Sequence, residues 1–185
     1  MTTTHDPGSL LILGLGNVLC GDDGLGVAAV ELLRQQFETP EAIRVVDGGT
    51  LGLALLEQFQ ATDDVVLVDA IQTGDPPGSF VRLEGDDVGP AVRNRLSCHQ
   101  VGVAELLDAL RWLDAYPRRV VLLGLVPESL DVRVTRSAAV ERQMPRLLEA
   151  IVEEVDRLGY GLLRKTDGAG GRRGRRDRAA RALGL

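Results

Sequence analysis

The feature that most constrains the fold is the stretch from residue 10 to residue 26, where an apolar run leads into a glycine-rich loop and then into a helical pattern. The run from Leu10 to Leu15 carries no polar side chain, which is typical of a strand that is covered on both faces of a parallel sheet. The apolar spacing that follows predicts a helix from about Gly24 to Phe37. Open α/β sheets usually bind ligands in the loops after the carboxyl ends of their strands. We therefore look for function first in this loop.

The same alternation of strands and helices continues along the chain. Apolar runs predict buried strands at 43–47, 64–70 and 119–126, and an alternating pattern predicts a half-exposed antiparallel edge strand at 79–83. Helical spacing of apolar residues predicts helices at about 50–59, 101–113 and 137–158. Strands and helices at this spacing predict an α/β fold, a doubly wound sandwich with helices on both faces of the sheet.

Length and charge limit the domain organisation and the partners. We expect one α/β domain at residues 10–163, after a flexible N-terminus at residues 1–9. The net charge of the chain is −6, but residues 164–185 contain eight Lys or Arg and two Asp, so this segment is +6 and the rest is −12. An acidic body argues against nucleic acid as a partner. The Gly/Arg-rich segment 164–185 has no periodicity, and we expect it to be a disordered tail.

Localisation follows from segments that the sequence lacks. No apolar run approaches the roughly 20 residues that span a bilayer, and the first residues do not resemble a signal peptide. Cys20 and Cys98 lie in different segments without the CxxC spacing of a zinc ribbon or redox motif. We therefore expect a cytoplasmic protein without membrane insertion or a disulfide framework.

The glycines of the first loop also suggest a dinucleotide-binding protein. The GxGxxG pattern that begins at Gly14 would need a third glycine where Leu19 stands, and no GKS or GKT sequence follows. A nucleotide-binding module is therefore a minor alternative.

Carboxylates recur where the predicted strands end. Asp22 and Asp23 follow the first strand, Asp47 ends the second and Asp69 ends the third. In a parallel sheet these positions gather along one edge. A single aspartate at such a position is more often a cap or turn residue than a functional one, and Asp22 or Asp23 can cap the helix that follows. Capping explains Asp69 less well, because apolar residues follow it.

His99 is the histidine best placed to join these carboxylates. A lone histidine at a helix start is more often a cap or hydrogen-bonded residue than a ligand. Two carboxylates and an imidazole at one sheet edge favour a first-row metal such as nickel, zinc or iron over magnesium or calcium. Cys20 and Cys98 are most simply small structural residues, and the motifs of serine hydrolases and zincins are absent from the sequence.

These residues resemble the hydrogenase maturation proteases, the family that processes the large subunit of nickel–iron hydrogenases. The resemblance extends from about Leu10 to Leu158 and leaves the tail unexplained. It rests on motifs in family order and at family-like spacing: GLGNVLCGDDGLG at 14–26, DGGTLG at 47–52, VDA at 68–70, SCHQVG at 97–102 and GLVPE at 124–128. Each motif is weak alone, whereas together they are highly specific.

The resemblance implies a three-layer sandwich with a twisted, mostly parallel five-stranded sheet, in agreement with the pattern above. It implies an aspartic-type endopeptidase that removes a C-terminal extension from the hydrogenase large-subunit precursor after nickel insertion. The family positions that contact metal fall on Asp23, Asp69 and His99, and Asp22 matches the adjacent acidic position. The segment that flanks the cleft falls on Asp47, Gly48, Gly49 and Thr50.

The resemblance also implies how nickel is used. The substrate's cysteines hold the nickel, and we expect no tightly bound resident metal in the protease. Asp23, Asp69 and His99 would bind the open positions of that nickel and align the scissile peptide, while Asp22 or Asp23 could activate water. The hydrogenase precursor is then the partner, and we expect a monomeric protease. A resident-metal hydrolase of small substrates and a non-catalytic nucleotide-binding module are the alternatives.

Overall fold

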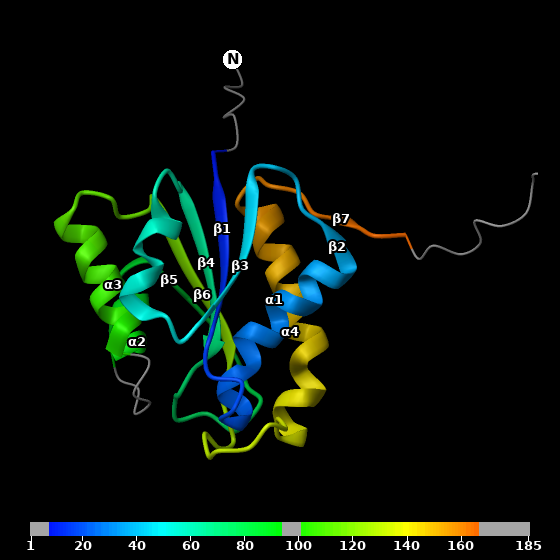
Figure 1. The fold of residues 1–185 in the computed structure, drawn as a ribbon. Helices are drawn as coiled ribbons and strands as arrows, with labels where there is room; N and C mark the ends of the chain where they lie inside the picture. Colours follow the sequence, from blue (N-terminus) through cyan, green and yellow to red (C-terminus); the bar gives the residue numbers. More distant parts are fainter. Residues whose placement is uncertain (1–7, 94–100, 167–185) are drawn as a thin grey trace, which may run out of the picture.

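A five-stranded sheet forms the centre of the computed structural model, which describes residues 8–93 and 101–166. The strand order is β3-β1-β4-β6-β5 (Figure 1). The strands are β1 (Leu10–Leu15), β3 (Ile43–Gly49), β4 (Asp64–Ala70), β5 (Phe80–Glu84) and β6 (Arg119–Leu125). The first four in this order are parallel, and β5 is antiparallel to β6. The predicted α/β fold with one antiparallel edge strand is confirmed.

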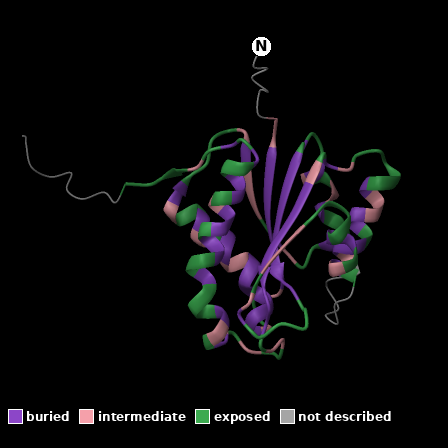
Figure 2. Ribbon diagram, turned by 180° about the vertical axis from the view of Figure 1, so that it is seen from behind, coloured by how far each residue is buried: buried purple, intermediate pink, exposed green. Residues whose placement is uncertain are grey.

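Two hydrophobic cores lie on opposite faces of this sheet. Helices α1 (Leu25–Gln36) and α4 (Ala138–Arg157) cover one face, while α2 (Val88–Arg93), α3 (Val101–Trp112) and the 3₁₀ helix η2 (Gly52–Phe59) cover the other (Figure 1). Alternate residues of β1 point to the two cores, Leu10 and Ile12 to the first and Leu11 and Leu13 to the second. Figure 2 shows the buried strands between helices whose outer surfaces are exposed.

The helices agree with the predicted segments, with two differences. Helix α4 begins after Ser137, whose side chain accepts a hydrogen bond from the Val140 N–H at 3.2 Å, as a helix N-cap does. The helix predicted at 50–59 is the 3₁₀ helix η2. Helix α2 was not predicted, because a proline inside a helix usually breaks it. Pro90 lies in the first turn of α2, where a proline is tolerated.

A small antiparallel sheet of two strands forms near the end of the described chain. Strand β2 (Phe37–Glu38) pairs with β7 (Leu163–Arg164), and the Lys165 N–H donates to the Gln36 carbonyl at 2.8 Å. Arg164, which the sequence placed in the tail, therefore belongs to a strand. Residues 167–185 of the predicted tail and residues 1–7 lie outside the described residues. Within the described residues, no helix is long and apolar enough to cross a membrane.

Candidate functional site

The predicted site residues that the structure describes lie at the carboxyl ends of neighbouring parallel strands. The register places Gly14 of β1 beside Asp47 of β3 and Val68 of β4, so Asp69 lies one residue beyond that level. Asp22 and Asp23 follow β1 in the 3₁₀ helix η1 (Gly21–Gly24). This carboxyl edge is the lower end of the sheet in Figure 1. The prediction that these aspartates share one edge is confirmed.

Asp23 is fully buried and is held by the loop that precedes it. Its Oδ2 accepts a hydrogen bond from the Asn17 N–H at 2.7 Å. The loop folds this closely because residue 16 is glycine: its φ is +115°, and a Cβ there would lie 1.8 Å from the Asp23 carbonyl oxygen. The glycine-rich loop therefore fixes Asp23 at the sheet edge.

Asp69 is also buried, at the end of the central strand β4. Its Oδ1 accepts from the Ala70 N–H at 2.7 Å. On the neighbouring strand β6, a Cβ on Gly124 would lie 1.9 Å from the Asp69 carbonyl oxygen. Because residue 124 is glycine, β4 and β6 can lie close together at this point. This close packing holds the backbone of Asp69 in a fixed position.

Asp22 has a different role from the predicted helix cap. Neither η1 nor α1 has a side-chain cap. The fully buried carboxylate of Asp22 instead accepts from backbone groups more than a hundred residues away: the Ser137 N–H at 2.6 Å, the Glu128 N–H at 2.8 Å and the Ser129 N–H at 3.4 Å. Asp22 thus connects the first loop to the loop between β6 and α4. The tertiary contacts replace the local cap because they offer three donors.

The loop between β6 and α4 also pairs with the first loop through its backbone. The Arg133 N–H donates to the Leu19 carbonyl at 2.9 Å, and the Gly21 N–H donates to the Arg133 carbonyl at 2.6 Å. The Arg133 side chain lies over Gly21, where a Cβ would be 2.8 Å from Nε. Nε and Nη2 of Arg133 are buried and have no hydrogen-bond partner among the residues described. Cys20 is partly buried in the same loop. No pattern in the sequence predicts these contacts between Arg133 and the first loop.

The predicted cleft segment borders the same loop. Asp47 and Thr50 are exposed, Gly48 is buried, and the Gly49 carbonyl accepts from the Gly16 N–H at 2.9 Å. The segment thus lies beside the loop that holds Asp23.

His99 and Cys98 lie outside the described residues. Gly102, near the start of α3, packs on Gly52 at the start of η2, since a Cβ on Gly102 would lie 2.7 Å from the Gly52 Cα. Among residues 8–93 and 101–166, no group of three or more His, Cys, Asp or Glu residues could hold a metal ion. The predicted set of three includes His99, so it remains a prediction.

Another buried carboxylate, that of Asp64, lies at the opposite end of the sheet. Asp64 begins β4 and accepts from Arg118, Arg119 and Tyr160. Burial alone would raise the pKa of this carboxyl, but the hydrogen bonds from Arg119, Arg118 and Tyr160 lower its pKa to about 2. This network joins β4, β6 and the end of α4, and we interpret it as structural.

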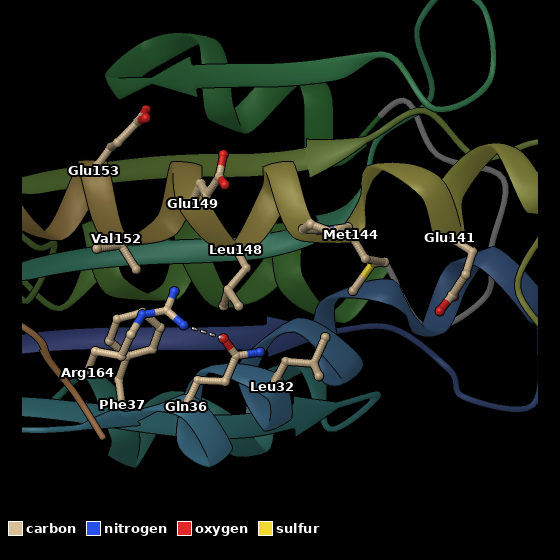
Figure 3. Close-up of a pocket in the computed structure, with 11 residues that line it drawn as sticks. Leu32, Gln36, Phe37, Glu141, Met144, Leu148, Glu149, Val152, Glu153 and Arg164 are labelled. Carbon is tan, nitrogen blue, oxygen red and sulfur yellow. Dashed lines mark hydrogen bonds between the residues drawn. The ribbon is translucent and has the colours of Figure 1, made fainter. Parts of the chain in front are cut away.

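A groove of about 540 Å³ lies between α1 and α4 (Figure 3). Met144, Leu148 and Val152 line one side of it, and the Arg164 guanidinium lies over the Phe37 ring, 4.9 Å from its centroid. None of the predicted site residues lines this groove.

Comparisons with known proteins agree with this architecture. Residues 27–154 match the family model of hydrogenase maturation proteases. The hydrogenase 2 maturation protease of Escherichia coli K12 is 35% identical over 144 residues, which cover 77% of this chain and 88% of that protein. The hydrogenase expression/formation protein HoxM of Azotobacter vinelandii is 38% identical over 124 residues, and the match spans 66% of this chain and 60% of HoxM.

The solved structure of the hydrogenase maturating endopeptidase HybD from E. coli has the same fold. It superposes with a TM-score of 0.81 at 32% identity and covers 85% of this chain and 98% of HybD. The fold and the relatives define a peptide hydrolase of the α/β class. The chain belongs to the hydrogenase maturation protease family, and the resemblance seen in the sequence is confirmed.

Proposed function

We propose that this protein removes a C-terminal extension from the large-subunit precursor of a nickel–iron hydrogenase after nickel insertion. Family membership supplies the reaction, hydrolysis of a peptide bond. The observation that carries the proposal is the pair of buried carboxylates, Asp23 and Asp69, which backbone N–H groups hold at the carboxyl ends of adjacent strands.

The nickel in this proposal belongs to the substrate. Asp23, Asp69 and His99 bind its open positions, and carboxylate and imidazole donors suit a first-row metal. The part assigned to His99 rests on the resemblance of the motif at 97–102 to the family. Nickel held in this way brings the scissile peptide to a fixed place, and a precursor without nickel lacks this anchor.

The two adjacent aspartates have separate roles in this proposal. Both oxygens of Asp22 accept backbone hydrogen bonds, so we assign Asp22 a positioning role. Asp23 is then the better candidate of the two to activate the attacking water. The exposed residues Asp47 and Thr50 border the path of the substrate chain. The cytoplasmic location and the monomeric state are further parts of the proposal.

A cleavage assay tests the proposed function. Nickel-loaded and nickel-free precursors are incubated with the protein, and mass spectrometry follows the C-terminus of each. We expect a discrete C-terminal peptide to be released from the loaded precursor alone. Release from both precursors would contradict the role of nickel, and release from neither would contradict the assigned substrate. Metal analysis of the purified protein distinguishes the alternative, because a resident-metal hydrolase contains stoichiometric zinc or nickel.

A further inference from the structure

Exposed apolar side chains gather around the proposed site. They come from the segments that follow β1, β3 and β6, with Leu53 in the first turn of η2 and the others in loops, and each is more than half exposed. We name this set the apolar rim; its members are Val18, Leu19, Leu51, Leu53, Val132 and Val134. Val132 and Val134 are the most exposed, at 87% and 76%.

Backbone hydrogen bonds hold the three loops of the apolar rim together. The first loop is joined to the end of β3 by the bond from Gly16 to Gly49, and to the loop after β6 by the bond from Arg133 to Leu19, both at 2.9 Å. The buried carboxylate of Asp22 adds three more bonds between the first and third loops. The rim is therefore a preformed surface, which lowers the entropy cost of binding.

Apolar side chains exposed together in this way usually mark a surface that binds another protein. The partner class follows from the family, because the substrate of a maturation protease is itself a protein. The rim adjoins Asp23 and the segment 47–50, so a protein whose peptide reaches the proposed site must lie against it.

We propose that the apolar rim is the docking surface for the substrate protein, which covers it with apolar side chains close to the C-terminal extension. This inference rests on the proposed function and deepens it. Docking on the rim is independent of the nickel, so the rim supplies affinity to loaded and unloaded precursors alike. Nickel then decides which docked precursor is cleaved.

Arg133 joins two of the loops that carry the apolar rim. It lies between the two most exposed rim residues, and its Nε and Nη2 have no hydrogen-bond partner among the described residues. An unpaired buried donor costs free energy. Because both nitrogens are buried, the bound protein does not contact them, and Arg133 contributes to the rim through the backbone hydrogen bonds that join the first loop to the loop after β6.

The test compares two double variants. Val132→Asp/Val134→Asp places charges on the rim, and Trp112→Asp/Leu113→Asp places them on equally exposed apolar side chains at the end of α3. Binding to nickel-free precursor and cleavage of loaded precursor are measured for both. We expect the rim variant to bind at least about tenfold more weakly and to raise KM by a similar factor, with kcat changed less than about twofold. We expect the control variant to match the wild type.

The outcomes separate this inference from the proposed function. If the wild type does not cleave the loaded precursor, the proposed function fails. If the wild type cleaves it and the rim variant keeps the wild-type affinity and KM, the docking inference alone is wrong. Thermal unfolding checks that each variant folds, and Leu19→Asp is a second rim variant that gives the same comparison from another loop.

Discussion

Replacing Asp22 by asparagine tests whether this residue holds the loops of the site together. The carboxylate uses both oxygens: Oδ1 accepts from Ser137, and Oδ2 accepts from Glu128 and Ser129. An asparagine side chain has one acceptor oxygen and turns an NH₂ group toward a backbone donor. The Asp22→Asn variant therefore leaves unpaired at least one of these N–H groups, of which that of Ser137 is buried and those of Glu128 and Ser129 are partly buried.

The cost of Asp22→Asn follows from these bonds. A hydrogen bond to a charged group contributes about 1.5–3 kcal/mol, and a buried donor without a partner costs about 1–3 kcal/mol. Since a weaker bond to the amide oxygen remains, we expect the free energy of unfolding to fall by about 2–4 kcal/mol. For a chain of this length, that loss lowers Tm by about 5–15 °C.

Urea denaturation and amide hydrogen exchange measure the two consequences. The exchange rates of the Glu128 and Ser137 amides should rise above those of the wild type, because one of them loses its acceptor and the other keeps only a weaker one. Asp47→Asn is the matched control: it makes the same change on an exposed side chain at the same sheet edge, and its unfolding free energy should stay within about 0.5 kcal/mol. An Asp22→Asn protein as stable as this control, with unchanged exchange, would refute the positioning role.

Three other results are expected. The pKa of Asp64 lies at about 2 in the folded protein, whereas its ordinary value is 3.8. The lowered pKa contributes up to about 2 kcal/mol to the free energy of unfolding above about pH 4, and this contribution is lost as the pH falls toward 2. Urea titrations of Asp64→Asn should lack this loss. Gly16→Ala should lower the unfolding free energy by more than about 2 kcal/mol, since its Cβ meets the Asp23 carbonyl. The control Gly161→Ala, with no atom within 4 Å of the added Cβ, should not. Glu154→Gln should cost about 2 kcal/mol in thermal unfolding, because Arg82 then loses the carboxylate that binds it at 2.8 Å, and an unchanged Tm would contradict this.

The main sheet was predictable because its strands carry strong local patterns. Every residue of β4 is buried, and the sequence there is an apolar run that only a strand covered on both faces explains. Strand β5 was predicted within one residue at each end, from its alternating pattern. The pairing of β2 with β7 was not predictable, because residues 37–38 and 163–164 carry no signal that they meet.

The edge of the sheet at which the candidate site lies was predictable from the sequence. Parallel strands bring their ends together, so the aspartates that end them share an edge whatever their role. The contacts of Asp22 were not predictable, because local capping rules concern the next few residues and its donors lie more than a hundred residues away. For the same reason nothing in the sequence indicated that Arg133 lies over Gly21.

The cleavage rate of nickel-loaded precursor by variants of the proposed nickel-binding residues tests the role of the substrate's nickel. The variants are Asp23→Asn, Asp69→Asn and His99→Gln. They are compared with the wild type and with the control Trp112→Asp/Leu113→Asp, which lies outside the apolar rim, and thermal unfolding checks that each protein folds. We expect each of the three to slow cleavage at saturating precursor by about 100-fold or more, because the scissile bond is no longer aligned, while the control keeps the wild-type rate. Folded variants that cleave the loaded precursor at the wild-type rate would contradict the proposed role of Asp23, Asp69 and His99.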